Sequence, residues 1–188
     1  MDNSPALQLI IILILLALSA FFSSSETALT TVSHLKLRSL ADDGNKKAKK
    51  VLKGTENSSK LLSAILVGNN IVNISASALA TTFCTNMFGS KYIGVSTGIL
   101  TLLVLIFGEI SPKTLATQYA LQLSMVVVYP ISWLMTLLTP VIFLLNILTG
   151  AIFKLFRVDP SAKKASITEA ELRTIVNVSH EEGVIEPE

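Results

Sequence analysis

The stretch Ile99-Leu-Thr-Leu-Leu-Val-Leu-Ile-Phe-Gly-Glu-Ile-Ser-Pro112 decides what kind of protein this is. Its only charged residue, Glu109, lies near the end of an otherwise apolar run. A charged side chain in hydrocarbon costs about 2.5 to 3.5 kcal/mol on insertion scales, so it needs a partner, a cavity or an ion. Two hypotheses follow. Glu109 is either solvated at the membrane–water boundary and paired with nearby Lys113, or it is the ligand of an ion.

The composition around this stretch is that of an integral membrane protein. The 188 residues are 51% hydrophobic and 15% charged, and residues 3–25, 61–90 and 114–153 contain no charged residue and no histidine. Because about 20 apolar residues cross a bilayer core, each block is long enough to span it. The sequence has no nucleic-acid-binding motif, no nucleophile–base set and no phosphate loop. We therefore expect an all-α integral membrane protein that is not an enzyme and does not bind nucleic acid.

The charge distribution predicts how the chain crosses the membrane. Residues 34–53 carry seven Lys or Arg against two Asp, which predicts that they are cytoplasmic and that the N-terminus is outside. We expect three transmembrane helices, at about 6–31, 58–87 and 91–117, in a multi-pass protein of the plasma membrane. The last two helices are joined by the short link 88–91, as in an antiparallel hairpin.

The fourth apolar block, about 119–156, is interrupted by Pro130 and Pro140. Each proline removes one helical hydrogen bond. A single crossing would leave the basic residues after it outside, against the charge rule. We therefore expect kinked juxtamembrane helices that start and end on the cytoplasmic side, and a plain fourth span is the alternative.

The last stretch, 158–188, is polar and follows the transmembrane domain, residues 1–157. Thr168 and Glu171 match a capping box, and apolar residues follow at helical spacing. We expect a short cytosolic helix here, the start of a truncated helical bundle with a cytoplasmic C-terminus.

Polar residues recur at helical spacing inside the first two spans. Ser19 and Ser23 share one face of the first helix, and Asn69 and Asn73 share one face of the second. Serine in membrane helices commonly bonds to its own backbone, which we expect for the neighbouring residues 24 and 25. A lone asparagine usually joins helices by hydrogen bonding; for this pair, facing serines and a glutamate, a ligand role is slightly favoured.

The third span adds Gly108, Glu109 and Pro112. Pro112 has no N–H and crowds the carbonyl group four residues earlier, which predicts a structural kink that frees the Gly108 oxygen. Three helices thus supply hydroxyl, amide, carbonyl and carboxylate oxygens. Such donors suit Mg²⁺, Ca²⁺ or Na⁺ rather than zinc or copper.

Small residues predict self-association of these helices. Gly94 and Gly98 on the third helix, and Ala76 and Ala80 on the second, allow close helix approach. We expect a homodimer in the lipid bilayer with these residues at its interface.

Four stretches resemble the transmembrane domain of the cyclin M (CNNM) and CorB–CorC family of magnesium transporters. They are residues 18–29 (LSAFFSSSETAL), 67–73 (VGNNIVN), 108–113 (GEISPK) and 181–186 (EEGVIE). The resemblance implies a homodimer with three membrane-spanning helices, juxtamembrane helices around them and an acidic helical bundle. It also implies a downstream CBS pair, the only place where nucleotide binding is expected, which this sequence does not contain.

The resemblance further implies Mg²⁺ efflux, coupled in some members to Na⁺ entry. A dehydrated Mg²⁺ is then expected in mid-membrane, and the choice among the asparagines 69, 70 and 73 stays open. The expected ligands are Ser19, Ser23, Asn69, Asn73, the Gly108 carbonyl and Glu109. A non-transporting membrane anchor that presents a cytosolic regulatory domain is the alternative function.

Overall fold

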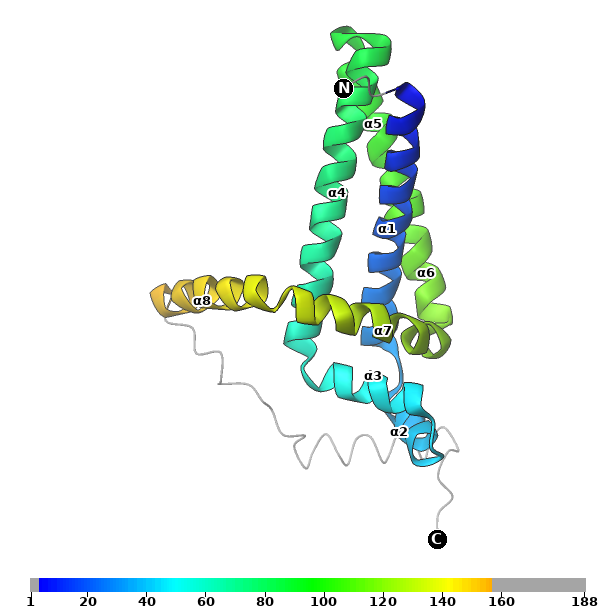
Figure 1. The fold of residues 1–188 in the computed structure, drawn as a ribbon, viewed down its shortest axis with the longest axis vertical. Coiled ribbons are helices and arrows are strands. Elements are labelled where there is room, and N and C mark those ends of the chain that lie inside the picture. Colours follow the sequence, from blue (N-terminus) through cyan, green and yellow to red (C-terminus); the bar gives the residue numbers. More distant parts are fainter. Residues whose placement is uncertain (1–3, 157–188) are drawn as a thin grey trace, which may run out of the picture. The chain divides into compact units, whose positions relative to one another are not determined.

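The computed structural model describes residues 4–156, and the regular structure within them is entirely helical (Figure 1). The chain divides into a unit that ends at Phe143 and a second unit that begins at Leu144. The first unit holds every candidate site residue. The all-α membrane fold expected from the sequence is confirmed.

Three long helical rods make up most of the first unit. The first is α1 (Pro5–Thr31) and the second is α4 (Ser58–Phe88), which runs in the opposite direction in Figure 1. The third rod is continuous but changes geometry along its length. It consists of a 3₁₀ turn η1 (Ser90–Tyr92), α5 (Ile93–Leu103), a π-helical segment η2 (Val104–Ile110) and α6 (Ser111–Gln118).

The connection between the second and third rods is as short as the sequence predicted. Gly89 follows the last residue of α4 with φ of 81°, a left-handed conformation that glycine adopts without strain. The chain can therefore reverse at once, and the third rod returns beside α4.

The basic segment after α1 is helical, where we expected only a cytoplasmic connection. It forms α2 (His34–Asp42) and α3 (Lys46–Glu56), separated by Gly44 with φ of 89°. Both helices begin at a polar cap, because Ser33 Oγ accepts from Lys36 N–H and Asn45 Oδ1 accepts from Lys47 N–H. These caps and the apolar positions behind them were the sequence signals for two short helices.

Helix α7 (Ala120–Leu137) lies across α1 and α4 rather than alongside them (Figure 1). Its length and composition would allow a fourth crossing, as they do for Pro5–Thr31, Ser58–Phe88 and Ser90–Gln118. Its position across the end of the bundle instead favours the juxtamembrane collar over a fourth span.

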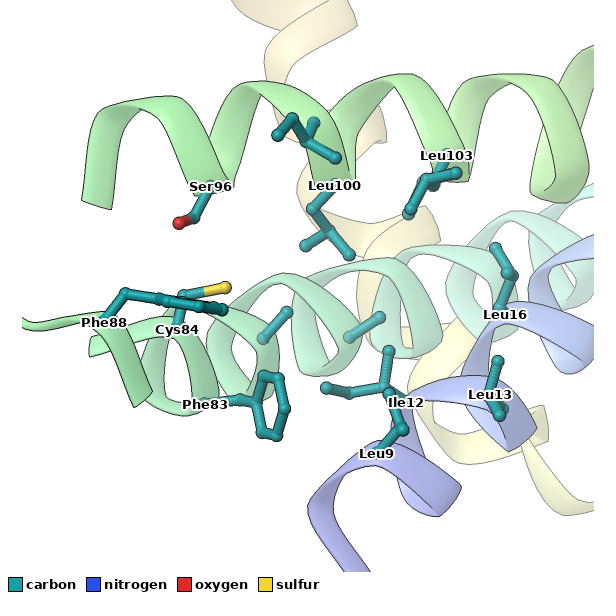
Figure 2. Close-up of a pocket in the computed structure, with 14 residues that line it drawn as sticks. Leu9, Ile12, Leu13, Leu16, Phe83, Cys84, Phe88, Ser96, Leu100 and Leu103 are labelled. Carbon is teal, nitrogen blue, oxygen red and sulfur yellow. The ribbon is translucent and has the colours of Figure 1, made fainter. Parts of the chain in front are cut away.

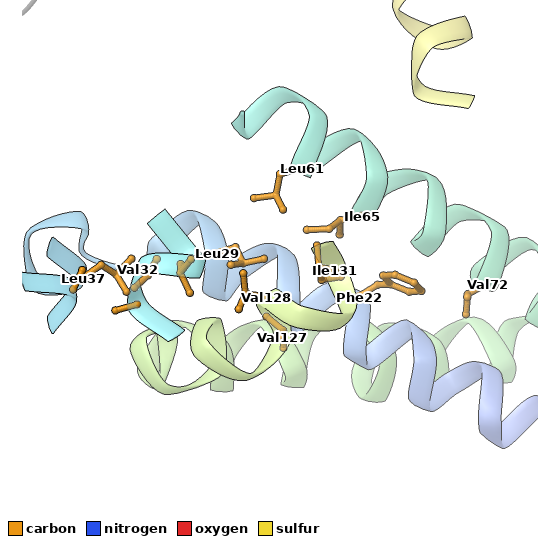
Figure 3. Packing of buried hydrophobic residues seen from close by; sticks show 13 residues of the cluster. Phe22, Leu29, Val32, Leu37, Leu61, Ile65, Val72, Val127, Val128 and Ile131 are labelled. Atoms are coloured by element: carbon orange, nitrogen blue, oxygen red, sulfur yellow. The ribbon is translucent and has the colours of Figure 1, made fainter. Parts of the chain in front are cut away.

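We call the end of the bundle where α7 crosses the base, and its buried apolar cluster the base core (Figure 3). Ile131 and Val128 of α7 are at most 1% exposed, as is Val51 of α3. The cluster joins five helices into one packed region. It contains Phe22, Leu29, Val32, Leu37, Ala41, Ala48, Val51, Leu61, Ile65, Val72, Val127, Val128 and Ile131.

The fourth apolar block is divided into two helices. α7 contains Pro130, and α8 (Thr139–Leu155) begins after Leu138 with Pro140 in its first turn, where a missing N–H costs nothing. The expected cytosolic helix and bundle, 158–188, lie outside the described residues.

Candidate metal-ion site between three helices

The third rod is π-helical where the sequence places its glutamate. The Ser111 N–H bonds to the Ile106 carbonyl, five residues earlier, at the end of η2. Pro112 follows directly in the first turn of α6. A wider turn before a proline relieves the clash between its ring and the preceding carbonyl groups. The irregular backbone predicted at Pro112 thus coincides with a π segment that ends just before it.

Gly108, inside this π segment, is buried against α1. Ser19 Oγ donates a long hydrogen bond, 3.5 Å, to the Gly108 carbonyl oxygen. A Cβ added to Gly108 would lie 2.9 Å from Ser19 Oγ and 3.3 Å from Leu16 Cδ1. The absence of a side chain therefore lets the Gly108 backbone approach the serine hydroxyl.

Glu109, the next residue, meets α4. Asn73 Nδ2 donates to Glu109 Oε1 at 3.3 Å, and the same nitrogen lies 3.5 Å from Asn69 Oδ1. The carboxylate is half-buried, as are both asparagines. Adjacent residues of η2 therefore contact α1 through Gly108 and α4 through Glu109, while Asn70 is exposed.

The hypothesis that Glu109 pairs with Lys113 is wrong. Lys113 Nζ lies 3.4 Å from Glu26 Oε2 instead, and this is the one ion pair among residues 4–156. Both side chains are about half exposed, at 45% and 40%. The carboxylate of Glu109 has no cationic side chain beside it in the described part of the chain.

Two buried side-chain oxygens in this region have no hydrogen-bond partner among the described residues, Ser23 Oγ and Asn73 Oδ1. Ser23 lies one helical turn after Ser19 and is fully buried. Its neighbours Ser24 and Ser25 both donate to the Phe21 carbonyl, at 3.0 and 2.6 Å, which confirms the role expected for them. A hydroxyl that does not use its own backbone in this way is available to another ligand.

Gly68 was not singled out from the sequence, although it sets how closely α4 approaches α1. A Cβ there would come within 2.7 Å of the Phe22 ring, which belongs to the base core. Its position directly before Asn69 was the available signal. Gly68 thus brings the asparagine-bearing face of α4 close to the serine-bearing helix.

An apolar cavity of about 370 Å³ adjoins the site on the side where α1 begins (Figure 2). Leu9, Leu13 and Leu16 of α1 line it with Leu100 and Leu103 of α5. Ala76 and Ala80, expected at a dimer interface, also line it and are each 2% exposed within the protomer. Apart from Ser96, the side chains that line this cavity are apolar or a cysteine.

The structure brings oxygen donors together in two groups: the Ser19 hydroxyl with the Gly108 carbonyl, and the Glu109 carboxylate with the amide groups of Asn73 and Asn69. Among residues 4–156, no hydrogen bond joins the Ser23 hydroxyl to either group. Residues 4–156 contain no cluster of three or more His, Cys, Asp or Glu side chains. A set with one carboxylate and several neutral oxygens matches a hard cation, and it offsets only part of a divalent charge.

Known proteins identify the family. The model of the cyclin M transmembrane N-terminal domain (CNNM) matches residues 10–188. A UPF0053 protein of Haemophilus influenzae is 44% identical over 145 residues, which cover 71% of this chain and 34% of that protein. A chloroplastic DUF21 domain-containing protein of Arabidopsis thaliana is 34% identical over 182 residues, 96% of this chain and 27% of its own length.

The UPF0053 inner membrane protein YfjD of Escherichia coli is 43% identical over 62% of this chain and 26% of its own length. The chain thus spans about a third or less of the length of these curated relatives. The match confirms the family named from the four sequence stretches. This chain is a multi-pass membrane protein that belongs to the CNNM family, and it carries that family's transmembrane domain.

Proposed function

We propose that this chain is the membrane domain of a divalent cation transporter that moves Mg²⁺ outward across the plasma membrane. The ion is held by the side-chain oxygens of Ser19, Ser23, Asn69, Asn73 and Glu109, together with the Gly108 carbonyl oxygen. Mg²⁺ is the substrate of this site and not a structural cofactor.

One observation carries the proposal: two buried oxygens that have no hydrogen-bond partner among residues 4–156 lie on α1 and α4, the two helices that contact the rod carrying the Glu109 carboxylate. Burying a hydroxyl or an amide oxygen without a partner costs about 1 to 3 kcal/mol. Ser23 Oγ and Asn73 Oδ1 are both in this state. A bound cation would satisfy both oxygens and would also compensate the charge of Glu109, which has no cationic side chain beside it among residues 4–156.

The composition of the site suits an ion that must leave as well as enter. Mg²⁺ requires near-octahedral coordination at about 2.1 Å and gives up its water reluctantly. A single carboxylate with neutral oxygens holds such an ion only moderately. The π segment supports this role, because π-helical turns are frequently found at functional sites.

The proposal also includes the orientation of the chain in the membrane, the coupling of Mg²⁺ efflux to Na⁺ entry and the assembly of the chain into a homodimer. The basic residues of α2 and α3 support a cytoplasmic base and an N-terminus outside. The CNNM resemblance implies Na⁺ entry as the driving reaction and a homodimer as the functional unit. Na⁺ prefers the same oxygen donors, so the two ions could occupy one site in turn.

A second function is supported by the hydrogen bond between Asn73 and Glu109. A bond of this kind joins membrane helices and is typically worth below about 2 kcal/mol. If Glu109 serves only to join the helices through this hydrogen bond, the domain is a membrane anchor that presents a cytosolic regulatory domain and transports no ion.

The substitution Glu109→Gln separates the two functions. It keeps the size of the side chain and one oxygen donor, and it removes the charge that balances the cation. We expect Mg²⁺ binding by the purified chain and Mg²⁺ efflux from loaded vesicles to be abolished, with yield and thermal unfolding unchanged. Ser23→Ala and Asn69→Ala should weaken both activities severely.

The matched control is Glu56→Gln, which makes the same chemical change on the exposed surface of α3. It should leave Mg²⁺ affinity and efflux unchanged. Wild-type Mg²⁺ affinity and transport in well-folded Glu109→Gln protein would eliminate the transport site. Loss of folding in that variant would instead favour the anchor.

A further inference from the structure

A small pocket lined by lysine and hydroxyl side chains lies at the base, away from the proposed ion site. It has a volume of about 210 Å³ and is formed by three helices. α3 contributes Lys50 and Lys53, α4 contributes Lys60, and α7 contributes Ser132, Met135 and Thr136. Its lining therefore combines three ammonium groups, two hydroxyl groups and one flexible apolar side chain.

The positive charge of this pocket has no partner of opposite charge in the described part of the chain. Among residues 4–156, no carboxylate lies within ion-pair distance of Lys50, Lys53 or Lys60. Lys60 lies in the first turn of α4, and the N-terminal end of a helix carries positive partial charge. Three lysines and a helix start thus attract an anion to one place.

The surroundings put this pocket at the level of the membrane surface. α3 packs its small apolar face on α7, since a Cβ on Gly54 would lie 3.6 Å from Val128 Cγ2. On α7, Tyr129 and Trp133 are 49% and 69% exposed. Exposed tyrosine and tryptophan of membrane proteins concentrate where headgroups meet acyl chains. Tyr129 and Trp133 therefore favour a position of this pocket near lipid phosphates.

We propose that this pocket, which we call the basic pocket, binds the phosphate of an anionic membrane lipid. Lysine ammonium groups bind phosphate as point charges, and basic pockets between membrane helices bind anionic headgroups. Ser132 and Thr136 can donate to the headgroup, and Met135 lies against its apolar part. Binding ties α3, α4 and α7 together, and it does not depend on whether the chain transports Mg²⁺.

The test is a titration of the purified chain in neutral detergent with dioctanoyl phosphatidylglycerol, followed by calorimetry or native mass spectrometry. The variant Lys50→Gln, Lys53→Gln, Lys60→Gln removes the three pocket charges. Each lysine is expected to contribute about five-fold in affinity, so the triple variant should bind about a hundred-fold more weakly.

The matched control, Lys46→Gln, Lys47→Gln, Lys49→Gln, removes the same number of charges from exposed positions of α3 that do not line the pocket. It should bind within about two-fold of the unmodified chain. Ser132→Leu keeps all the charges and fills the pocket, and it should also weaken binding at least ten-fold.

Three outcomes overturn the proposal. Equal losses of lipid affinity in the two triple variants would mean that the basic surface attracts the anionic lipid diffusely and that the pocket is not a binding site. Equal affinity for dioctanoyl phosphatidylcholine would remove the need for an anionic headgroup. Inorganic phosphate binding as tightly as the lipid, with the same dependence on the pocket lysines, would assign the pocket to a soluble phosphate.

Discussion

The base core and α5 are both apolar, but the base core is buried within the protomer and α5 is exposed. Leu37, Val51 and Ile131 of the base core are fully buried within the protomer. α5 has no buried residue, and Val95 and Leu102 on it are 65% and 59% exposed. Apolar sequence alone therefore does not say what covers a helix: the base is covered by the chain itself, and α5 needs lipid or another copy.

The largest expected effect is a difference in stability between two leucine-to-alanine variants, one in the base core and one on α5. Leu61→Ala in the base core should lower the free energy of unfolding by about 2 to 5 kcal/mol, because it leaves a cavity among packed side chains. Leu102→Ala on α5 removes the same atoms from an exposed position and should change stability by less than about 0.5 kcal/mol. Thermal unfolding of both variants in detergent measures the difference in stability. Equal losses of stability would contradict the distinction between a buried base core and an exposed α5.

The exposed face of α5 is covered either by a second copy of the chain or by lipid, and a substitution at Gly98 distinguishes the two. Among residues 4–156, and apart from the backbone of its own helix, no heavy atom lies within 4 Å of a Cβ added at Gly98, so this face has room for the side chain of Gly98→Leu. If a second copy packs there, the dimer dissociation constant should rise at least ten-fold, about 1.4 kcal/mol. Detergent-corrected mass measured over a range of protein concentrations reports it. An unchanged dimer would place lipid against this face.

Two buried serines of α1, between the base core and α5, distinguish a role in ion binding from a role in helix structure. Ser23 and Ser25 are both fully buried, but only Ser25 donates to a carbonyl of its own helix. Neither Ser23→Ala nor Ser25→Ala should change the free energy of unfolding by more than about 1 kcal/mol. Ser23→Ala should reduce Mg²⁺ affinity about ten-fold, because it removes a hydroxyl that contacts a charge.

Ser25→Ala should leave Mg²⁺ affinity unchanged in the same titration. Equal affinities in the two variants would exclude Ser23 from the coordination shell. A large loss of stability in Ser23→Ala would show that its hydroxyl has a structural partner.

The smallest effect is expected at the ion pair between α1 and α6. Glu26 and Lys113 are about half exposed, and pairs of this kind contribute about 0 to 1 kcal/mol. Glu26→Gln should therefore lower the unfolding midpoint slightly at low salt and not at all at high salt, where the pair is screened. A larger loss that persists in high salt would mean that Glu26 supports the site one turn above it.

Much of this fold was predictable because its signals are long. An apolar block of 20 or more residues can only be a helix in a membrane, since every backbone group needs an internal partner. The three rods accordingly begin and end within two residues of the expected positions. α2 and α3 were missed because we treated 34–53 as one basic connection, although Ser33 and Asn45 mark the start of each helix.

The candidate site was predictable as a set of residues and not as an arrangement. Spacing of four residues placed Asn69 beside Asn73 along α4. It could not show that Asn73 and not Asn69 reaches Glu109, or that Lys113 turns to Glu26. Such contacts depend on how far each helix is rotated against its neighbours, and no pattern within one helix contains that information.

The sequence by itself determined the class of protein, the number of long rods and the family, because hydrophobicity, charge segregation and short motifs are properties of the linear chain. Only the tertiary structure decided which polar groups meet. It brought Ser19 against Gly108 and Phe22 against Gly68, left Ser23 Oγ and Asn73 Oδ1 unpaired among residues 4–156, and placed α7 across the base. The physical reason is that each of these features depends on contacts between distant segments, whose geometry is set by side-chain packing.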